Sequence, residues 1–393
     1  MEAMRTRKVK RILVSVPTAT HTQRLLLEGI LRYGKEKRGD AWMLQLDIGG
    51  FAQQRLHDLP GWNCDGVIAY LDNPQMRENA LSFRLPTVLI EPYPPVRRTR
   101  RADVVSFVCD YAGEGETAAR HFLERHFKSF ACIGTAEPTP WGERRCAGFA
   151  AAVRRAGRPC AVYPSLSSAE LNDFALEMPQ LMKWLQSLPR PTALFVAHDI
   201  RARQVLTAAN AAGISVPHHL AVLSVDNDEL VCETATPPLS SIPTGDLSLG
   251  YACGRALEEL ICKRASGRTI VTRHTRVVSR ASTDLTACDD ALVSQTLTWA
   301  RSHLSEDLSA DKLARRINYS KRMLQIRTQK ALGTTLGDEI RKMRLSAAAD
   351  LLVNTKLPVA DIAAACGFTN VSHLSMRLLQ AYHLTPLALR QTS

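Results

Sequence analysis

The sequence predicts an α/β region of two subdomains, followed by an all-α region with two helix-turn-helix motifs. Short apolar runs alternate with amphipathic segments from Lys10 to about Ile200, a pattern typical of parallel sheets covered by helices on both faces. The last quarter of the chain contains one motif twice. It is also basic, with 14 Lys and Arg against 7 Asp and Glu between residues 291 and 393. A chain of 393 residues is too long to fold around a single hydrophobic core, so two or three domains are expected.

The α/β region is built from predicted strands and helices that alternate along the chain. The predicted strands are Arg11–Val16, Trp42–Asp47, Gly66–Tyr70, Thr87–Ile90, Val104–Cys109, Phe130–Gly134, Ala193–Ala197 and Leu220–Val225. The predicted helices include Gln23–Lys37, Gly115–His126, Glu143–Ala156, Glu177–Ser187 and Ile200–Ala212. About 270 residues of such alternation favour two subdomains with a cleft between them. Ligands of open α/β sheets bind where strands end and helices begin.

Polar side chains that follow the predicted strands are therefore candidates for a ligand site. They are Asp110, Trp141, Arg145, Asp199, Asp226 and Asn227. Carboxylates and arginine hydrogen-bond the hydroxyls of a neutral sugar in pairs, and an indole face covers its C–H face. Each residue taken alone could instead cap a helix or form a loop salt bridge. The set together favours sugar binding.

A dinucleotide-like pattern lies in the same region. Residues 113–118 read Gly-Glu-Gly-Glu-Thr-Ala after a predicted strand and fit a loose G-x-G-x-x-A motif. Glu114 and Glu116 would stand where a pyrophosphate must bind, and like charges repel it. We therefore expect no nucleotide cofactor.

The repeated motif begins at residues 308–314 and returns at residues 357–363. In the first copy, Ser309 is a predicted N-cap of a helix that runs to Ile317, and Ser320 caps a second helix. That second helix is expected from Lys321 to about Lys330. The spacing predicts a helix-turn-helix.

The second copy has the same plan with different cap residues. Pro358 suits a helix start and Gly367 ends that helix. Thr369 or Asn370 caps the next helix, expected over residues 371–382. Between the copies, residues 336–354 predict a helix about 28 Å long. Because major-groove half-sites repeat at about 34 Å, this helix could hold two recognition helices in successive grooves of double-stranded DNA.

Helical periodicity separates buried from outward positions in the two recognition helices. Leu324, Thr328 and Leu332 share the inner side of the first, and Leu374 and Leu378 that of the second. The outward positions predicted to read bases are Arg322, Gln325, Ile326, Gln329, Val371, Ser372, His373 and Met376. The positions predicted to contact phosphates are Lys321, Asn370 and Arg377. An ordinary helical bundle with a solvated charged face is the alternative, which the duplication and the local basic charge disfavour.

The second copy also resembles a known family. Residues 367–373 (Gly-Phe-Thr-Asn-Val-Ser-His), Thr385-Pro386 and Arg390 are similar to the AraC/XylS family of transcription regulators, and residues 331–333 resemble the first half of its domain. The resemblance implies base contacts from the outward positions and RNA polymerase as a partner. That family usually has phenylalanine where this chain has Thr328, Leu374 and Leu378, which implies a smaller core.

The α/β region resembles the effector domain of LacI-type regulators. The similar segments include residues 108–110, 145–149 and 225–227, and the resemblance implies that Arg145 and Asp226 bind the ligand. The DNA-binding headpiece of that family would precede Lys10, and we expect the C-terminal tandem to replace it. The combination resembles regulators of pentose operons, which implies a xylose-like pentose as effector and adds Arg24 to the candidate ligand residues.

The polar segment from Ser279 to Asp290 suggests the domain boundary. We predict an effector domain at residues 1–283 and a DNA-binding domain at residues 284–393. The expected mechanism is that sugar closes the cleft and thereby changes how two protomers of a homodimer pair. A metabolic enzyme with a Rossmann-like domain and a sugar-binding protein without DNA activity are the competing function classes.

Several function classes are disfavoured by composition and motifs. The ten cysteines have no C-x-x-C pair, so we expect neither disulfides nor a metal site. The basic N-terminus is followed by an apolar run too short for a signal peptide, and no run has the length of a membrane span, so a cytoplasmic protein without a membrane partner is expected. The sequence contains no G-x-S-x-G, H-E-x-x-H or Walker A motif, so we expect no enzyme.

Overall fold

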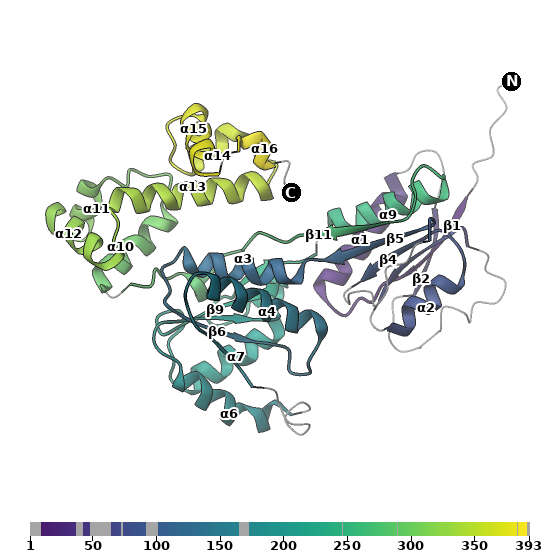
Figure 1. Cartoon of the computed structure of the whole chain (residues 1–393), viewed down its shortest axis with the longest axis horizontal. Helices are drawn as coiled ribbons and strands as arrows, with labels where there is room; N and C mark the ends of the chain where they lie inside the picture. The colour runs from purple at the N-terminus through teal and green to yellow at the C-terminus, as the bar shows by residue number, and fades with distance from the viewer. Residues whose placement is uncertain are drawn as a thin grey trace.

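A computed structural model of the chain describes residues 9–36, 42–47, 64–71, 74–91, 101–164, 173–245, 247–288, 290–382 and 384–390. Figure 1 shows an α/β part with two parallel sheets and a separate helical part at the C-terminal end. This arrangement confirms the predicted fold class. Residues 93–96 (Tyr-Pro-Pro-Val), whose sequence also resembles that of regulators of pentose operons, fall outside the described residues.

The first subdomain contains a six-stranded parallel sheet, counted over the described residues, in the order β11-β5-β4-β3-β1-β2. Its strands are β1 (Lys10–Ser15), β2 (Trp42–Asp47), β3 (Gly66–Tyr70), β4 (Thr87–Glu91), β5 (Val104–Cys109) and β11 (Arg268–Thr272). Its helices are α1 (His21–Glu36), α2 (Pro74–Ser82) and α9 (Leu247–Ile261). Apolar strand residues such as Ile12, Val14 and Ile68 are fully buried beneath α1 and α9.

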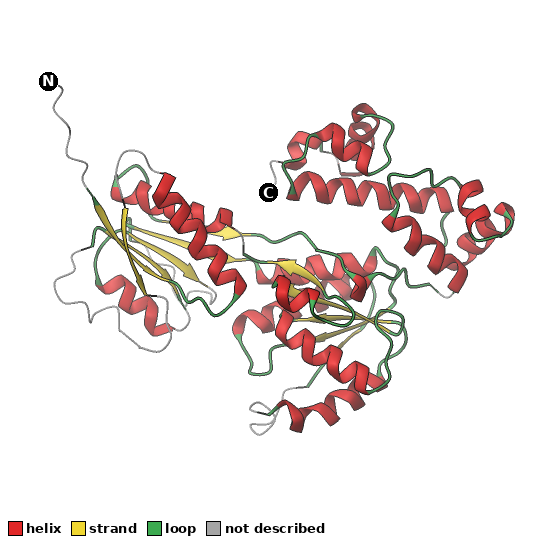
Figure 2. Ribbon diagram, turned by 180° about the vertical axis from the view of Figure 1, so that it is seen from behind, coloured by secondary structure: helices red, strands yellow, loops and turns green. Residues whose placement is uncertain are grey.

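The second subdomain contains a five-stranded parallel sheet, again over the described residues, in the order β10-β9-β8-β6-β7. Its strands are β6 (Ser129–Ile133), β7 (Cys160–Val162), β8 (Thr192–Val196), β9 (Leu220–Asp226) and β10 (Ser240–Pro243). Its helices are α3 (Tyr111–Leu123), α4 (Pro140–Arg155), α6 (Phe174–Ser187), α7 (Asp199–Ala211) and α8 (Glu229–Glu233). Figure 2 shows helices on both sides of this sheet. All eight predicted strands are present.

The chain passes between the two subdomains at three places. It leaves the first sheet after β5, returns after β10, and crosses again after β11 into residues that pair with β10 through Ser241 and Val278. Sequence patterns did not predict β7, β10, β11 or α9, because the strands are short and β11 joins its partner β5 from far along the chain. The crossovers form the hinge of the cleft between the subdomains.

Helices α3 and α4 pack closely because glycines stand at their crossing. A Cβ on Gly148 would lie 2.2 Å from the carbonyl oxygen of Ala112, and a Cβ on Gly115 would lie 2.1 Å from that of Arg145. Gly115 belongs to the dinucleotide-like pattern, so helix packing accounts for the glycine that seemed to match that motif. The backbone of α3 is thereby held directly against the helix that carries Arg145.

We expect Gly148→Ala to lower the free energy of unfolding by about 1–3 kcal/mol, because backbone atoms must move to admit the methyl group. Gly134→Ala is the matched control, since a Cβ there would meet nothing within 4 Å. Urea denaturation of both variants measures the difference. Equal stabilities for the two variants would contradict the close crossing of α3 and α4.

The helical part consists of two small bundles that share one long helix. Its elements are α10 (Ala291–Ser302), α11 (Ala310–Arg316), α12 (Lys321–Leu332), α13 (Leu336–Asn354), α14 (Val359–Ala365), α15 (Val371–Tyr382) and α16 (Pro386–Arg390). Figure 1 shows α11 and α12 at one end of α13 and α14–α16 at the other. Ile340 of α13 belongs to the core of the first bundle and Leu352 to that of the second. The predicted connecting helix is therefore present with its predicted bounds.

The predicted caps of the helix-turn-helix motifs are also present. The side chain of Ser309 accepts from the Lys312 N–H, and that of Ser320 accepts from the Met323 N–H. Each bond satisfies a backbone donor in the first turn. No helix within the described ranges is both long and apolar enough to cross a membrane.

Candidate functional site

A cavity of about 300 Å³ lies between the two subdomains at the ends of their strands. The cavity is lined by residues from α1, from both sheets and from the start of α4. Its lining is Thr20, Thr22, Gln23, Leu26, Tyr70, Ile90, Glu91, Phe107, Cys109, Tyr111, Trp141, Arg145, Asp226, Thr244, Gly245, Leu249, Thr272 and His274. Three of the seven predicted ligand residues, Trp141, Arg145 and Asp226, meet there.

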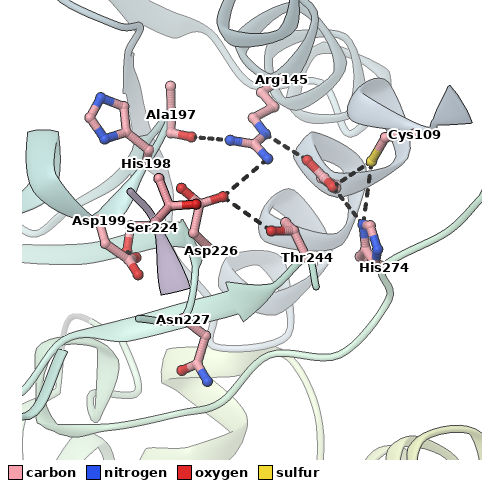
Figure 3. Close-up of polar contacts among 12 residues, drawn as sticks. Cys109, Arg145, Ala197, His198, Asp199, Ser224, Asp226, Asn227, Thr244 and His274 are labelled. Atoms are coloured by element: carbon pink, nitrogen blue, oxygen red, sulfur yellow. Dashed lines mark hydrogen bonds and ion pairs between the residues drawn. The ribbon is translucent and has the colours of Figure 1, made fainter. Parts of the chain in front are cut away.

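Arg145 is the centre of the polar network in this cavity (Figure 3). Its Nε donates to Oε2 of Glu114 at 2.6 Å, and its Nη1 donates to the carbonyl of Ala197 at 2.7 Å. Its Nη2 lies 3.4 Å from Oδ1 of Asp226, and its guanidinium stands 4.9 Å from the centre of the Trp141 ring. Burial alone would lower the pKa of Arg145, but the two carboxylates raise it above its usual value. The site therefore holds a permanent, fixed cation.

Glu114 is fully buried beneath the cavity and divides its two oxygens between different partners. Oε2 accepts from Arg145, whereas Oε1 lies 2.7 Å from Nδ1 of His274 and 3.0 Å from Sγ of Cys109. Burial would raise the pKa of Glu114, but Arg145 and His274 lower it, so the carboxylate is ionised. Burial raises the pKa of the Cys109 thiol well above its usual value, which keeps that thiol neutral.

Asp226 ends β9 with a left-handed backbone, at φ 107°, a conformation that is costly for a residue with a side chain. Its Oδ1 accepts from Oγ1 of Thr244 at 3.1 Å, and its side chain is 35% exposed, facing the cavity. Burial raises the pKa of Asp226 to about 7, against the opposing effect of Arg145. This carboxylate has a poorly compensated charge and free acceptor capacity.

The other four predicted ligand residues do not line the cavity and have structural partners instead. The carboxylate of Asp199 accepts from Ser224 Oγ, Ser241 Oγ and the Asp228 N–H at 2.5, 2.6 and 2.7 Å. Asp199 therefore fixes the loop after β9. Asp226 also follows a strand, but unlike Asp199 it lines the cavity.

Asp110 and Arg24 bind nearby backbone groups, and Asn227 binds the side chain of Arg280. Oδ1 of Asp110 caps α3 by accepting from the Gly113 N–H at 3.0 Å. Oδ1 of Asn227 accepts from Nη1 of Arg280 at 2.9 Å. The Nη1 of Arg24 donates to the Thr18 carbonyl at 2.9 Å. These are the helix-cap and loop roles that single polar residues at strand ends commonly have.

Helix α12 presents the predicted outward face. Leu324 and Thr328 are fully buried, and Leu332 is half-buried. The predicted contact residues of this helix are all exposed, as are Met323 and Lys330; they are Lys321, Arg322, Gln325, Ile326 and Gln329. Nζ of Lys321 lies 2.7 Å from Oδ2 of Asp311, at the side of the motif. The exposed surface of α12 is therefore mostly polar, with Met323 and Ile326 as its apolar members.

Helix α15 has a similar outward face, but two of its predicted contact residues are less exposed. Leu374 and Leu378 are buried, whereas Val371, Ser372 and Met376 are exposed. Two further predicted contact residues, His373 and Arg377, are half-buried, and Nη1 of Arg377 donates to Oε1 of Gln380 at 3.2 Å.

Asn370 has a role that the phosphate-contact prediction omitted. Its Oδ1 caps α15 by accepting from the His373 N–H at 2.8 Å. Its side chain is therefore fixed at the start of the helix, next to the predicted base-reading positions.

Comparisons with known proteins match both parts of the chain. A family of periplasmic binding protein-like domains matches residues 119–283, and a family of helix-turn-helix domains matches residues 313–392. The xylose operon regulatory protein of Escherichia coli K12 is 28% identical over 349 residues, which cover 86% of this chain and 87% of that protein. The chain therefore joins a periplasmic binding protein-like domain to a helix-turn-helix domain.

Further relatives are also similar to most of this chain. The xylose operon regulatory protein of Haemophilus influenzae is 26% identical and covers 83% of this chain and 84% of its own. The solved structure of the xylose-binding transcription activator XylR is 26% identical, with a TM-score of 0.61, and covers 98% of this chain and 99% of that one. A complex of the regulator CelR with cellobiose, 21% identical with a TM-score of 0.56, covers 70% of this chain and 85% of its own and shows the fold alone. The resemblances inferred from the sequence motifs are confirmed.

Several polar residues of the cavity were not predicted from the sequence. Glu91 ends β4 one residue beyond the predicted strand end and is held by Arg77. Glu114 was noted only as an obstacle to a pyrophosphate. Cys109 is the last residue of β5, and His274 lies just after β11. The strand-end rule could have found Glu91, but His274 required knowledge of β11.

Proposed function

We propose that this chain is a sugar-responsive, sequence-specific transcription regulator, with an effector domain at residues 1–283 and a DNA-binding domain at residues 284–393. The observation that carries the proposal is the presence of two sites in one chain. A cavity between the two subdomains is lined by Arg145 and Asp226, and two helices with exposed polar faces stand at opposite ends of α13. The relatives named above are regulators, so we propose no enzymatic activity.

The cavity suits a monosaccharide. Its volume of about 300 Å³ is at the small end of ligand sites. The cation of Arg145 and the carboxylate of Asp226 can bind adjacent hydroxyls, while the ring of Trp141 offers an apolar face. We propose a pentose, D-xylose or a close relative, because the most extensive matches above are regulators named for xylose.

Thermal unfolding of the purified protein with a panel of aldopentoses and hexoses tests the cavity. We expect one pentose to raise the melting temperature, and Asp226→Asn to weaken its binding by about 1.5–3 kcal/mol through loss of a charged acceptor. Asp228→Asn is the matched control, because Asp228 caps α8 and asparagine caps equally well. A pentose shift that survives unchanged in Asp226→Asn would contradict the site.

The outward faces of α12 and α15 suit two successive major grooves. Arg322 and Gln325 offer donors to base edges, and the exposed Ile326 and Met376 can contact thymine methyl groups. We propose that the chain binds double-stranded DNA as a homodimer, contacts RNA polymerase and activates pentose catabolic genes in the cytoplasm. Support for activation comes from the name of the structural relative, a transcription activator.

Helix α3 connects the cavity to the DNA-binding domain. Glu114 near its first turn contacts Arg145 in the cavity. Just beyond its other end, Oε2 of Glu124 accepts from Oγ of Ser346 at 2.9 Å, and Nε2 of His126 lies 2.7 Å from Oε1 of Glu339. Ser346 and Glu339 belong to α13. Closure of the cleft around a sugar can therefore change how α13 is held, provided that the sugar binds the closed state more tightly.

A further inference from the structure

Three potential metal ligands meet at the hinge of the effector domain. Cys109 ends β5, His274 follows β11, and Glu114 lies in α3. Sγ of Cys109 is 3.4 Å from Nδ1 of His274 and 3.0 Å from Oε1 of Glu114, and that oxygen is 2.7 Å from Nδ1 of His274. Figure 3 shows Cys109 and His274 facing each other at one side of the Arg145 network. Cys109 and Glu114 are close in the sequence, whereas His274 comes from a distant segment of the chain.

We propose that Cys109, Glu114 and His274 bind a divalent transition-metal cation, with Zn²⁺ as the best fit. A thiolate, a carboxylate and an imidazole form a donor set typical of zinc. At zinc bond lengths a tetrahedral site separates its donor atoms by about 3.4–3.6 Å. The donors therefore need to move apart by less than about 1 Å. The proton of the Cys109 thiol leaves when the cation binds.

The two oxygens of the Glu114 carboxylate have different partners, and Oε1 is placed to bind the cation. Arg145 occupies Oε2, whereas Oε1 points to the thiol and the imidazole. Two other carboxylates, Glu91 and Asp226, line the cavity, and Glu114 lies behind it. Arg77 pairs with Glu91, and Arg145 pairs with Glu114.

The geometry leaves a coordination position open. Cys109 and His274 line the cavity, while Glu114 lies behind them. A fourth ligand, either water or a hydroxyl of a bound molecule, can therefore approach from the cavity. Cys109 ends β5 and His274 lies just after β11, where the chain passes between the subdomains, so a bound cation would hold the starts of these two crossovers together. This proposal does not depend on the identity of the sugar.

Cobalt substitution tests the site on the full-length protein. Co²⁺ takes the place of zinc, and a thiolate ligand gives it a charge-transfer absorption in the near ultraviolet. We expect Co²⁺ to produce this band with saturation at one equivalent per chain, and Zn²⁺ to abolish it by displacement. We expect Cys109→Ser and His274→Gln each to lose the band. Cys64→Ser is the control, because Cys64 is a partly buried thiol outside the cavity.

The outcomes separate this site from adventitious metal binding. A band that persists in Cys109→Ser, or that disappears in Cys64→Ser, would overturn the assignment, as would the absence of any band in the wild-type protein. Circular dichroism and thermal unfolding of each variant show whether it is folded. Should Cys109→Ser fail to fold, His274→Gln decides the matter, because loss of the imidazole must weaken Co²⁺ binding while the other cysteines remain.

Discussion

Replacing Arg145 with glutamine is expected to lower the free energy of unfolding by about 3–5 kcal/mol and to abolish the sugar-dependent rise in melting temperature. The stability falls because Glu114, fully buried, loses its guanidinium partner and is left with an uncompensated charge. Sugar binding is lost because the fixed cation at the centre of the cavity is removed. Urea denaturation and thermal unfolding with and without pentose measure the two effects.

Arg201→Gln is the matched control for this prediction. Arg201 forms an ion pair with Glu177 in the same subdomain, both side chains are only 2% exposed, and neither lines the cavity. We expect a similar loss of stability with the pentose shift retained. If both variants lost the pentose shift to the same degree, general destabilisation would explain it and Arg145 would have no specific role.

Changing Arg322 and His373 together to alanine is expected to weaken specific DNA binding by about 2–6 kcal/mol, since each good base contact contributes about 1–3 kcal/mol. Arg322 is exposed on α12 and His373 is half-buried on α15, so both recognition helices lose a contact. Neither belongs to a buried core cluster, so the fold should persist. Gel shifts with duplexes selected from a random pool, at several salt concentrations, measure the change.

Arg255→Ala provides the control for charge alone. Its side chain is 66% exposed on α9 in the effector domain, so its loss should leave specific affinity nearly unchanged. Affinity retained by the double variant would remove α12 and α15 as the recognition helices. A uniform loss for specific and random duplexes would mean that the two side chains contact phosphates rather than bases.

Local patterns predicted the secondary structure well because they depend on neighbouring residues. The periodicity of Leu324 and Thr328 located the buried side of α12, and Ser320 marked its start. The alternation of apolar runs located β1 and β9 in the same way. β11 was missed because it joins the first sheet from beyond the second subdomain, and that order is a property of the whole fold. α9 packs on the same sheet from the same distant part of the chain.

The roles of the cavity side chains also depend on the whole fold and could not be predicted from local sequence. Asp199 and Asp226 both follow apolar strands, and no local feature distinguishes them. The structure separates them because Ser224 and Ser241 donate to Asp199, while Asp226 turns to the cavity with a left-handed backbone. Glu114 looked like an obstacle to an anion, and only the tertiary contact with Arg145 gives it a role.

The most direct test measures DNA affinity of the full chain with and without its sugar. A pentose that raises the melting temperature should change the affinity for a selected duplex by about 5–150-fold, the usual range of coupling between two sites. The same pentose should have no such effect on Asp226→Asn at a concentration that saturates the wild-type protein. If a pentose binds in the cavity and the duplex affinity stays the same, the proposed link between the cleft and the recognition helices is wrong.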